Sequence, residues 1–174
     1  MKKLLTVVFV ATVLLGINTA NAQNTKAEKK AAKEKAIKNK IDSTNYTFTA
    51  NYATPLRGGQ RLLTPGYYDL KVTKDTITAY LPYFGRVYMN PPLNPDDAGI
   101  KFTSTKFDYN ITEKKKGGWM ITIQFNDTDK ARRMTLDISE SGYATLISVS
   151  NNRDAISFYG DVTTALYKKT DQGK

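Results

Sequence analysis

Cysteine and histidine are both absent from the 174 residues of this chain. Without cysteine there are no disulfides, no thiolate nucleophiles and no cysteine metal sites. Without histidine the chain cannot build a Ser-His-Asp or Cys-His catalytic set, an HExxH zinc site or the usual proton shuttle near neutral pH. We therefore expect no cofactor, no metal site and no catalytic residues, and a role in binding rather than in catalysis.

Long apolar runs are also absent beyond one stretch near the N-terminus. Met1-Lys2-Lys3 is positively charged, Leu4 to Ile17 is mostly apolar, and Ala20-Asn21-Ala22 is an A-x-A cleavage pattern. The apolar stretch of 14 residues is shorter than the roughly 20 that a spanning helix needs. We expect residues 1–22 to be a signal peptide. The mature protein, beginning at Gln23, would then be periplasmic or extracellular, with no membrane span after cleavage and no cysteine for lipoprotein acylation.

Acidic residues are few, and most of the excess positive charge lies in one short segment. Residues 23–41 carry seven Lys and two Glu, a net charge of +5 out of the formal +10 of the whole chain. The high isoelectric point therefore does not indicate a basic binding face. Since no recognisable nucleic-acid-binding motif accompanies it, we expect no nucleic-acid partner.

The same basic segment is predicted to be a spacer that is either helical or disordered. Its alanine, lysine and glutamate favour helix, and Thr25 with Glu28 forms a capping-box pattern. Its only large apolar side chains are Ile37 and Ile41, four residues apart, which gives one docking point near its C-terminal end. Contact of its lysines with an anionic surface is the alternative to a solvated spacer.

From residue 46 onward, apolar and polar residues alternate with a period of two, which is typical of strands. The first strand places Tyr46, Phe48, Ala50 and Tyr52 on one face. Many short strands with little helix between them predict an all-β antiparallel meander over a single domain, residues 42–174. Such a meander closes into a lipocalin-like barrel or half-barrel, or alternatively folds into a β-sandwich. The predicted strands are 46–52, 68–73, 76–81, 85–89, 100–104, 106–112, 119–125, 133–139, 143–150 and 155–161.

Aromatic and arginine side chains gather near the end of one predicted strand and in two later positions. Together they could hold a carboxylate, a phosphate or a sugar. The alternative is a strand corner whose aromatic rings fill the core while the arginines bond carbonyls or pair with an acid. In the last strand, Gly160 would allow a bulge or a close backbone approach. The candidate ligand-binding residues are Tyr83, Phe84, Arg86, Tyr88, Arg153 and Tyr159.

The paired carboxylates do not fit a known catalytic or calcium-binding pattern. Asp96 and Asp97 are adjacent, whereas glycosidase chemistry needs two carboxylates that face each other across a cleft. Asp127 and Asp129 match only a fragment of a calcium-binding loop. We interpret both pairs as turn formers.

Four strings of residues together resemble the DUF4251 family, a set of exported bacterial proteins of unknown function. They are Tyr80-Leu81-Pro82-Tyr83-Phe84-Gly85-Arg86, 99–102, 141–146 and 151–160, and the resemblance covers roughly residues 45 to 165. It implies an exported β-domain in a bacterial envelope, and it carries no activity, substrate or site residues.

Three functions are compatible with this pattern. The first is binding of a small or extended ligand, either a small molecule or a glycan, in a barrel mouth or cleft. A concave site lined by Tyr or Phe, with Arg86 or Arg153 at its rim, would support it. The alternative is a structural module that docks on another envelope protein through an exposed apolar patch. The least favoured is a carboxylate-based hydrolase.

Overall fold

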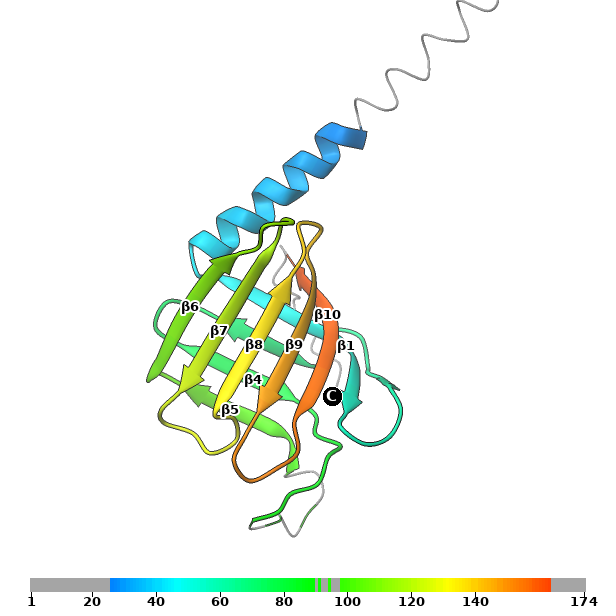
Figure 1. Ribbon diagram of the computed structural model, residues 1–174, viewed down its shortest axis with the longest axis vertical. Helices are drawn as coiled ribbons and strands as arrows, with labels where there is room; N and C mark the ends of the chain where they lie inside the picture. The colour runs from blue at the N-terminus through cyan, green and yellow to red at the C-terminus, as the bar shows by residue number, and fades with distance from the viewer. Residues whose placement is uncertain (1–25, 90, 92–93, 95–97, 164–174) are drawn as a thin grey trace, which may run out of the picture.

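The computed structural model describes residues 26–89, 91, 94 and 98–163. A helix over residues 26–42 precedes an antiparallel sheet of ten strands (Figure 1). The expected signal peptide, the Thr25 cap and the Asp96-Asp97 pair lie outside the described residues. The strands are β1 (Tyr46–Pro55), β2 (Arg61–Leu62), β3 (Asp69–Val72), β4 (Ile77–Leu81), β5 (Ile100–Ser104), β6 (Phe107–Glu113), β7 (Trp119–Phe125), β8 (Arg133–Ile138), β9 (Tyr143–Val149) and β10 (Ile156–Thr163).

The sheet is a meander that closes on itself through its first and last strands. The strand order is β5-β4-β3-β1-β10-β9-β8-β7-β6, with β2 paired to β1. Its two open edges, β5 and β6, are therefore consecutive in the chain and joined by a short turn. Strands β6 to β10 form one layer that crosses the strands behind it (Figure 1). The predicted all-β fold is confirmed as a nearly closed barrel.

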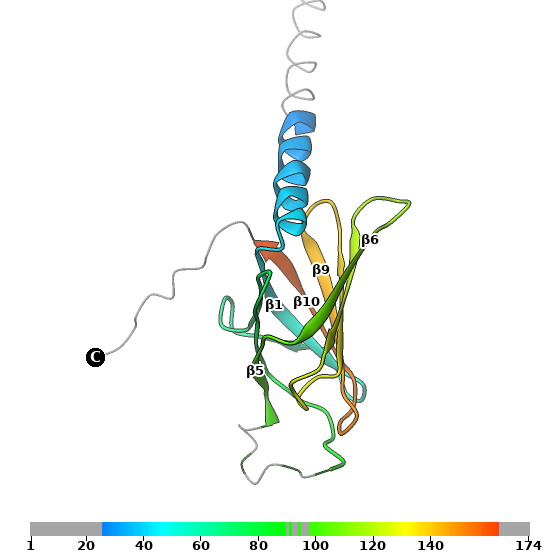
Figure 2. The ribbon, with the colours of Figure 1, turned by 90° about the vertical axis from the view of Figure 1, so that its left-hand side faces the viewer.

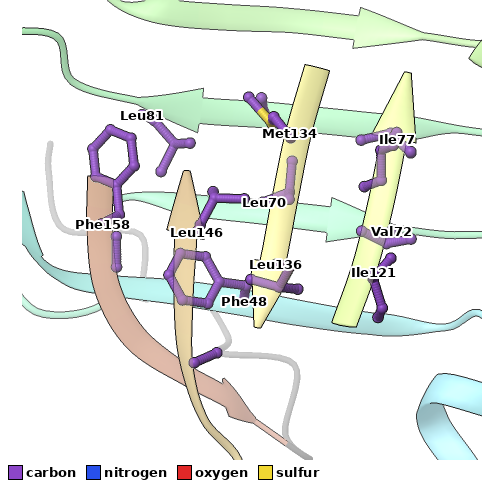
Figure 3. Packing of buried hydrophobic residues seen from close by; sticks show 14 of the residues in the cluster. Phe48, Leu70, Val72, Ile77, Leu81, Ile121, Met134, Leu136, Leu146 and Phe158 are labelled. Carbon is purple, nitrogen blue, oxygen red and sulfur yellow. The ribbon is translucent and has the colours of Figure 1, made fainter. Parts of the chain in front are cut away.

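Inward-facing side chains from both layers fill the barrel. Phe48 on β1 and Phe158 on β10 are fully buried, and Figure 3 shows them among aliphatic side chains from the facing strands. Near the open edges, the rings of Phe102 and Phe125 lie 5.0 Å apart, edge to face. The core therefore occupies the space in which hollow barrels hold a ligand.

The N-terminal helix docks on the barrel through the two predicted residues. Ile37 and Ile41 are buried, whereas most of the remaining helix is exposed. Ile37 packs against Gly142 in the β8–β9 turn, and the Lys38 ammonium lies 2.7 Å from a Glu113 carboxylate oxygen at the end of β6. Figure 2 shows the helix extending beyond the barrel along the long axis of the molecule. No described helix has the length and apolarity needed to cross a bilayer.

The structure lacks one predicted strand and contains one strand that was not predicted. Residues 85–89 do not form a strand and make one isolated bridge, between Val87 and Arg153. The preceding Pro82 cannot donate to a ladder, and a side chain at Gly85 would clash with the Tyr83 ring. The short strand β2, in the connection between β1 and β3, was not predicted, because two residues carry no periodicity.

Asp127 holds the corner between β5 and β6, where the sheet opens. Its carboxylate accepts hydrogen bonds from the Ser104 hydroxyl at 2.5 Å and from the backbone N–H groups of Thr105 and Lys106 at 2.9 and 3.1 Å. These bonds, the one from Ser104 first, lower the pKa of Asp127. This carboxylate, which comes from the β7–β8 connection, therefore stabilises the neighbouring β5–β6 turn. Among the described residues, no cluster of three or more acidic side chains could hold a metal ion.

Candidate functional site

A β-bulge between β1 and β10 shapes the outer surface of the sheet. Ala50 pairs with Gly160 and Tyr52 pairs with Tyr159, so Asn51 has no partner of its own on β10. A Cβ atom at Gly160 would lie 1.8 Å from the backbone oxygen of Thr49. Only glycine permits this close approach of the two strands, which confirms the bulge predicted at this position.

The bulge reverses which residues of β1 face outward. Before it, Phe48 and Ala50 point into the core, and after it Ala53 does. Asn51 and Tyr52 therefore both lie on the outer face, although they are consecutive in the chain. The expectation that Tyr52 shares the inner face with Phe48 was wrong, because strict alternation fails where one residue is inserted.

The two outward side chains border a groove of about 430 Å³ on the outer face of β8, β9, β10 and β1. Three tyrosines dominate it: Tyr52 and Tyr159 are 41% and 42% exposed, and Tyr143 is 70% exposed. Polar side chains from three strands and one turn complete the lining. The lining residues are Asn51, Tyr52, Asp137, Ser139, Tyr143, Ala144, Thr145, Tyr159 and Gly160.

The charged groups in and beside the groove are of both signs. The Lys114 ammonium lies 2.5 Å from a carboxylate oxygen of Asp137. The Asn51 amide donates to the Asp161 carboxylate at 3.0 Å. From the helix, the Lys33 ammonium lies 5.8 Å from the centre of the Tyr143 ring. The groove therefore offers aromatic faces and hydrogen-bonding groups without a strong net charge.

Four of the six predicted ligand-binding residues gather elsewhere, around Asp154 in the β9–β10 connection. The Tyr83 hydroxyl lies 2.9 Å from the carbonyl oxygen of Arg86 and 3.0 Å from that of Asp154, so its one proton is shared between them. The Tyr88 hydroxyl donates to the Asp154 carboxylate. The buried Arg153 donates to the Ala98 carbonyl at 2.9 Å and stacks 4.9 Å from the Tyr83 ring centre.

These contacts join the segment that follows β4 to the connection between β9 and β10. Burial is the main cause that raises the pKa of Tyr83 to about 12, and the hydrogen bond to Asp154 is the main cause that raises the pKa of Tyr88. Both hydroxyls are therefore protonated near neutral pH, and each donates a hydrogen bond within the protein. The corner interpretation fits this geometry better than an open ligand site.

The other two predicted residues are separated from this cluster and from each other. Phe84 is partly exposed, with the Arg61 guanidinium 4.7 Å from its ring centre. Tyr159 lines the groove on the outer face. Arg86 and Arg153 do not border that groove, so the aromatic lining expected for a ligand site is present without the expected arginine rim.

Sequence reasoning missed the partners of Tyr159. Tyr143 could have been found, because the alternation of Tyr143 and Thr145 with the buried Ala144 and Leu146 places the tyrosine outward. Tyr52 could not, because its direction depends on the bulge.

Comparison with known proteins identifies the family. A family model described as a domain of unknown function, DUF4251, matches residues 28–162. A crystal structure of a DUF4251 family protein from Bacteroides eggerthii DSM 20697 superposes with a TM-score of 0.57 at 15% identity, covering 76% of this chain and 87% of that chain. At this identity the likeness establishes the fold alone. No curated protein matches the chain. This chain belongs to the DUF4251 family.

Proposed function

We propose that this protein is an exported, non-enzymatic carbohydrate-binding protein, and that the groove on its outer face holds the sugar. The observation that carries the proposal is the gathering of Tyr52, Tyr143 and Tyr159 around one hollow with polar side chains between them. A tyrosine ring offers an apolar face and a hydroxyl on one rigid side chain. A sugar is complementary to it, because a pyranose has apolar C–H faces and a rim of hydroxyl groups.

The polar lining fits hydroxyl groups in the same way. The Asp137 carboxylate can accept hydrogen bonds from sugar hydroxyls, and bonds to an ionised acceptor are stronger than neutral ones. The Asn51 side chain and the Thr145 hydroxyl add an amide and a small donor-acceptor group at the same site. Because Lys114 already balances Asp137, a neutral ligand is favoured over a strongly charged one.

The expected signal peptide supports the setting of this function. A protein exported to the periplasm or the cell exterior meets cell-envelope glycans and external polysaccharides. The filled barrel supports an external site over a barrel-mouth site, since the interior is occupied by side chains such as Phe48 and Phe158.

The test is a binding screen of the purified protein against neutral oligosaccharides, followed by calorimetry. Tyr52→Ala and Tyr159→Ala should each lower the affinity by about tenfold or more, as removal of a central aromatic contact does. Tyr67→Ala is the matched control, because Tyr67 is similarly exposed and lies outside the groove. Failure of every oligosaccharide to bind, or an equal loss in the Tyr67 variant, would overturn the proposal.

Docking on another envelope protein is the second candidate. Ile147, which is 40% exposed on β9, extends the apolar surface beyond the groove lining. Ile147→Thr should leave sugar binding unchanged if the groove alone is the site. Failure of every neutral oligosaccharide to bind would favour this second candidate over the sugar site.

A further inference from the structure

We propose that the ligand is a neutral oligosaccharide chain that runs across the strands, from β2 to β7, rather than a single sugar. The inference rests on the proposed function and names the shape of its ligand. The register of the sheet supports it. Exposed side chains beyond both ends of the groove lie in line with the side chains that line the groove.

One side chain from each of six neighbouring strands stands in register on the outer face. Residues that pair directly across strands point to the same face, so consecutive pairs form a row. With neighbouring strands about 4.8 Å apart, five spacings give a row of about 24 Å. In order from β2 to β7, the row consists of Leu62, Tyr52, Tyr159, Thr145, Asp137 and Met120.

The groove covers only the middle of this row. Its lining includes the four residues from Tyr52 to Asp137 and neither terminal residue. The terminal side chains are large and apolar, yet Leu62 is 74% exposed and Met120 is 41% exposed. A single sugar would occupy the middle and leave both in water, whereas a chain along the row would cover them.

The chemistry along the row suits successive units of a neutral chain. Tyr52 and Tyr159, which pair across neighbouring strands, provide stacking surface, and Thr145 and Asp137 then provide hydrogen-bonding groups. Leu62 and Met120 add apolar contact for the C–H faces of the outer units. Lys114 balances the one carboxylate of the row, so the path carries no net charge that would require an ionic polymer.

The test measures how affinity depends on chain length. Cello-, malto- and N-acetylated chito-oligosaccharides, all neutral, are titrated from dimer to hexamer into the full protein by calorimetry. We expect affinity to rise with length, by about tenfold or more from dimer to hexamer in the series that binds. Leu62→Ser and Met120→Ser should each lower the hexamer affinity by about threefold to tenfold and leave the dimer affinity unchanged. Both side chains are exposed, so these variants keep the fold.

Leu56→Ser is the control, because Leu56 is also a highly exposed leucine but lies off the row. Equal affinity for dimer and hexamer would overturn the chain proposal and leave the proposed sugar site in place. An effect of Leu56→Ser equal to that of Leu62→Ser would also overturn it. Absence of binding at every length in all series would overturn the chain proposal together with the proposed function.

Discussion

Substitution of Gly160 by alanine tests whether the bulge beneath the groove depends on close backbone contact. The added Cβ would lie 1.8 Å from the backbone oxygen of Thr49 and 3.1 Å from the Cα of Ala50. Ordinary van der Waals contact begins near 3.4 Å, and the obstructing atoms are backbone, so they cannot rotate away. The two strands must separate, and they form the seam that closes the barrel.

The expected cost lies at the upper end of the range for overpacking, about 3 kcal/mol. With a urea m-value of about 2 kcal/mol per molar for a domain of this size, the unfolding midpoint should fall by about 1.5 M. The single tryptophan, Trp119, is buried on β7, so its fluorescence reports unfolding of the core. Gly160→Ala should also weaken sugar binding, because Asn51 and Tyr52 depend on the bulge for their direction.

Gly59→Ala is the matched control. A Cβ at Gly59 meets no atom within 4 Å, so this variant should stay within about 0.5 kcal/mol of the parent protein. If Gly160→Ala is as stable as the control, the strands accommodate a side chain at the bulge, and the account of how the groove forms is wrong.

Three further predictions concern the helix, the open corner and the loop cluster. Ile41→Ala should destabilise the protein by about 3 kcal/mol in urea unfolding, whereas the exposed Lys35→Ala should change it by less than about 0.5 kcal/mol; equal effects would mean that the helix does not dock. Folding lowers the pKa of Asp127, so its ionised form adds stability above the unfolded pKa of about 3.9, and that stability is lost as the pH falls through the folded pKa. Asp127→Asn should therefore lower stability at pH 7 and weaken its dependence on acid, and an unchanged acid-unfolding curve would contradict this. Tyr83→Phe should cost about 1 kcal/mol by removing the hydroxyl bond between the loops, and no change in melting temperature would show that the bond contributes nothing.

The fold could largely be predicted because apolar alternation determines it. Strands such as β7 and β9 alternate without interruption, and the structure places them within a residue of the predicted bounds. Ile37 and Ile41, isolated among lysines, correctly marked the docking point of the helix. The opening of the sheet between β5 and β6 could not be predicted. It depends on the pairing of β1 with β10, which are far apart in the sequence, and no local pattern indicates that pairing.

The candidate site was predictable only in part. Aromatic and arginine side chains near one another in the sequence indicate a ligand site at Tyr83, Arg86 and Arg153. The same side chains can join loops, and only the contacts around Asp154 distinguish the two uses. Strict alternation places Tyr52 in the core, whereas the bulge turns it outward at a point that the periodicity does not reveal. The glycine that permits the bulge lies more than a hundred residues away, at Gly160.

The most direct test of the central claim, that the ligand binds outside the barrel, is a ¹⁵N NMR titration of the full protein with the neutral hexasaccharide that binds most tightly. Binding along the row predicts that the amide shifts concentrate at residues 51–52, 143–145 and 159–160 on the outer face and extend to residues 62 and 120 at the two ends of the row. Shifts confined to the loop cluster around Tyr83 and Asp154, or spread through the core strands around Phe48, would contradict it.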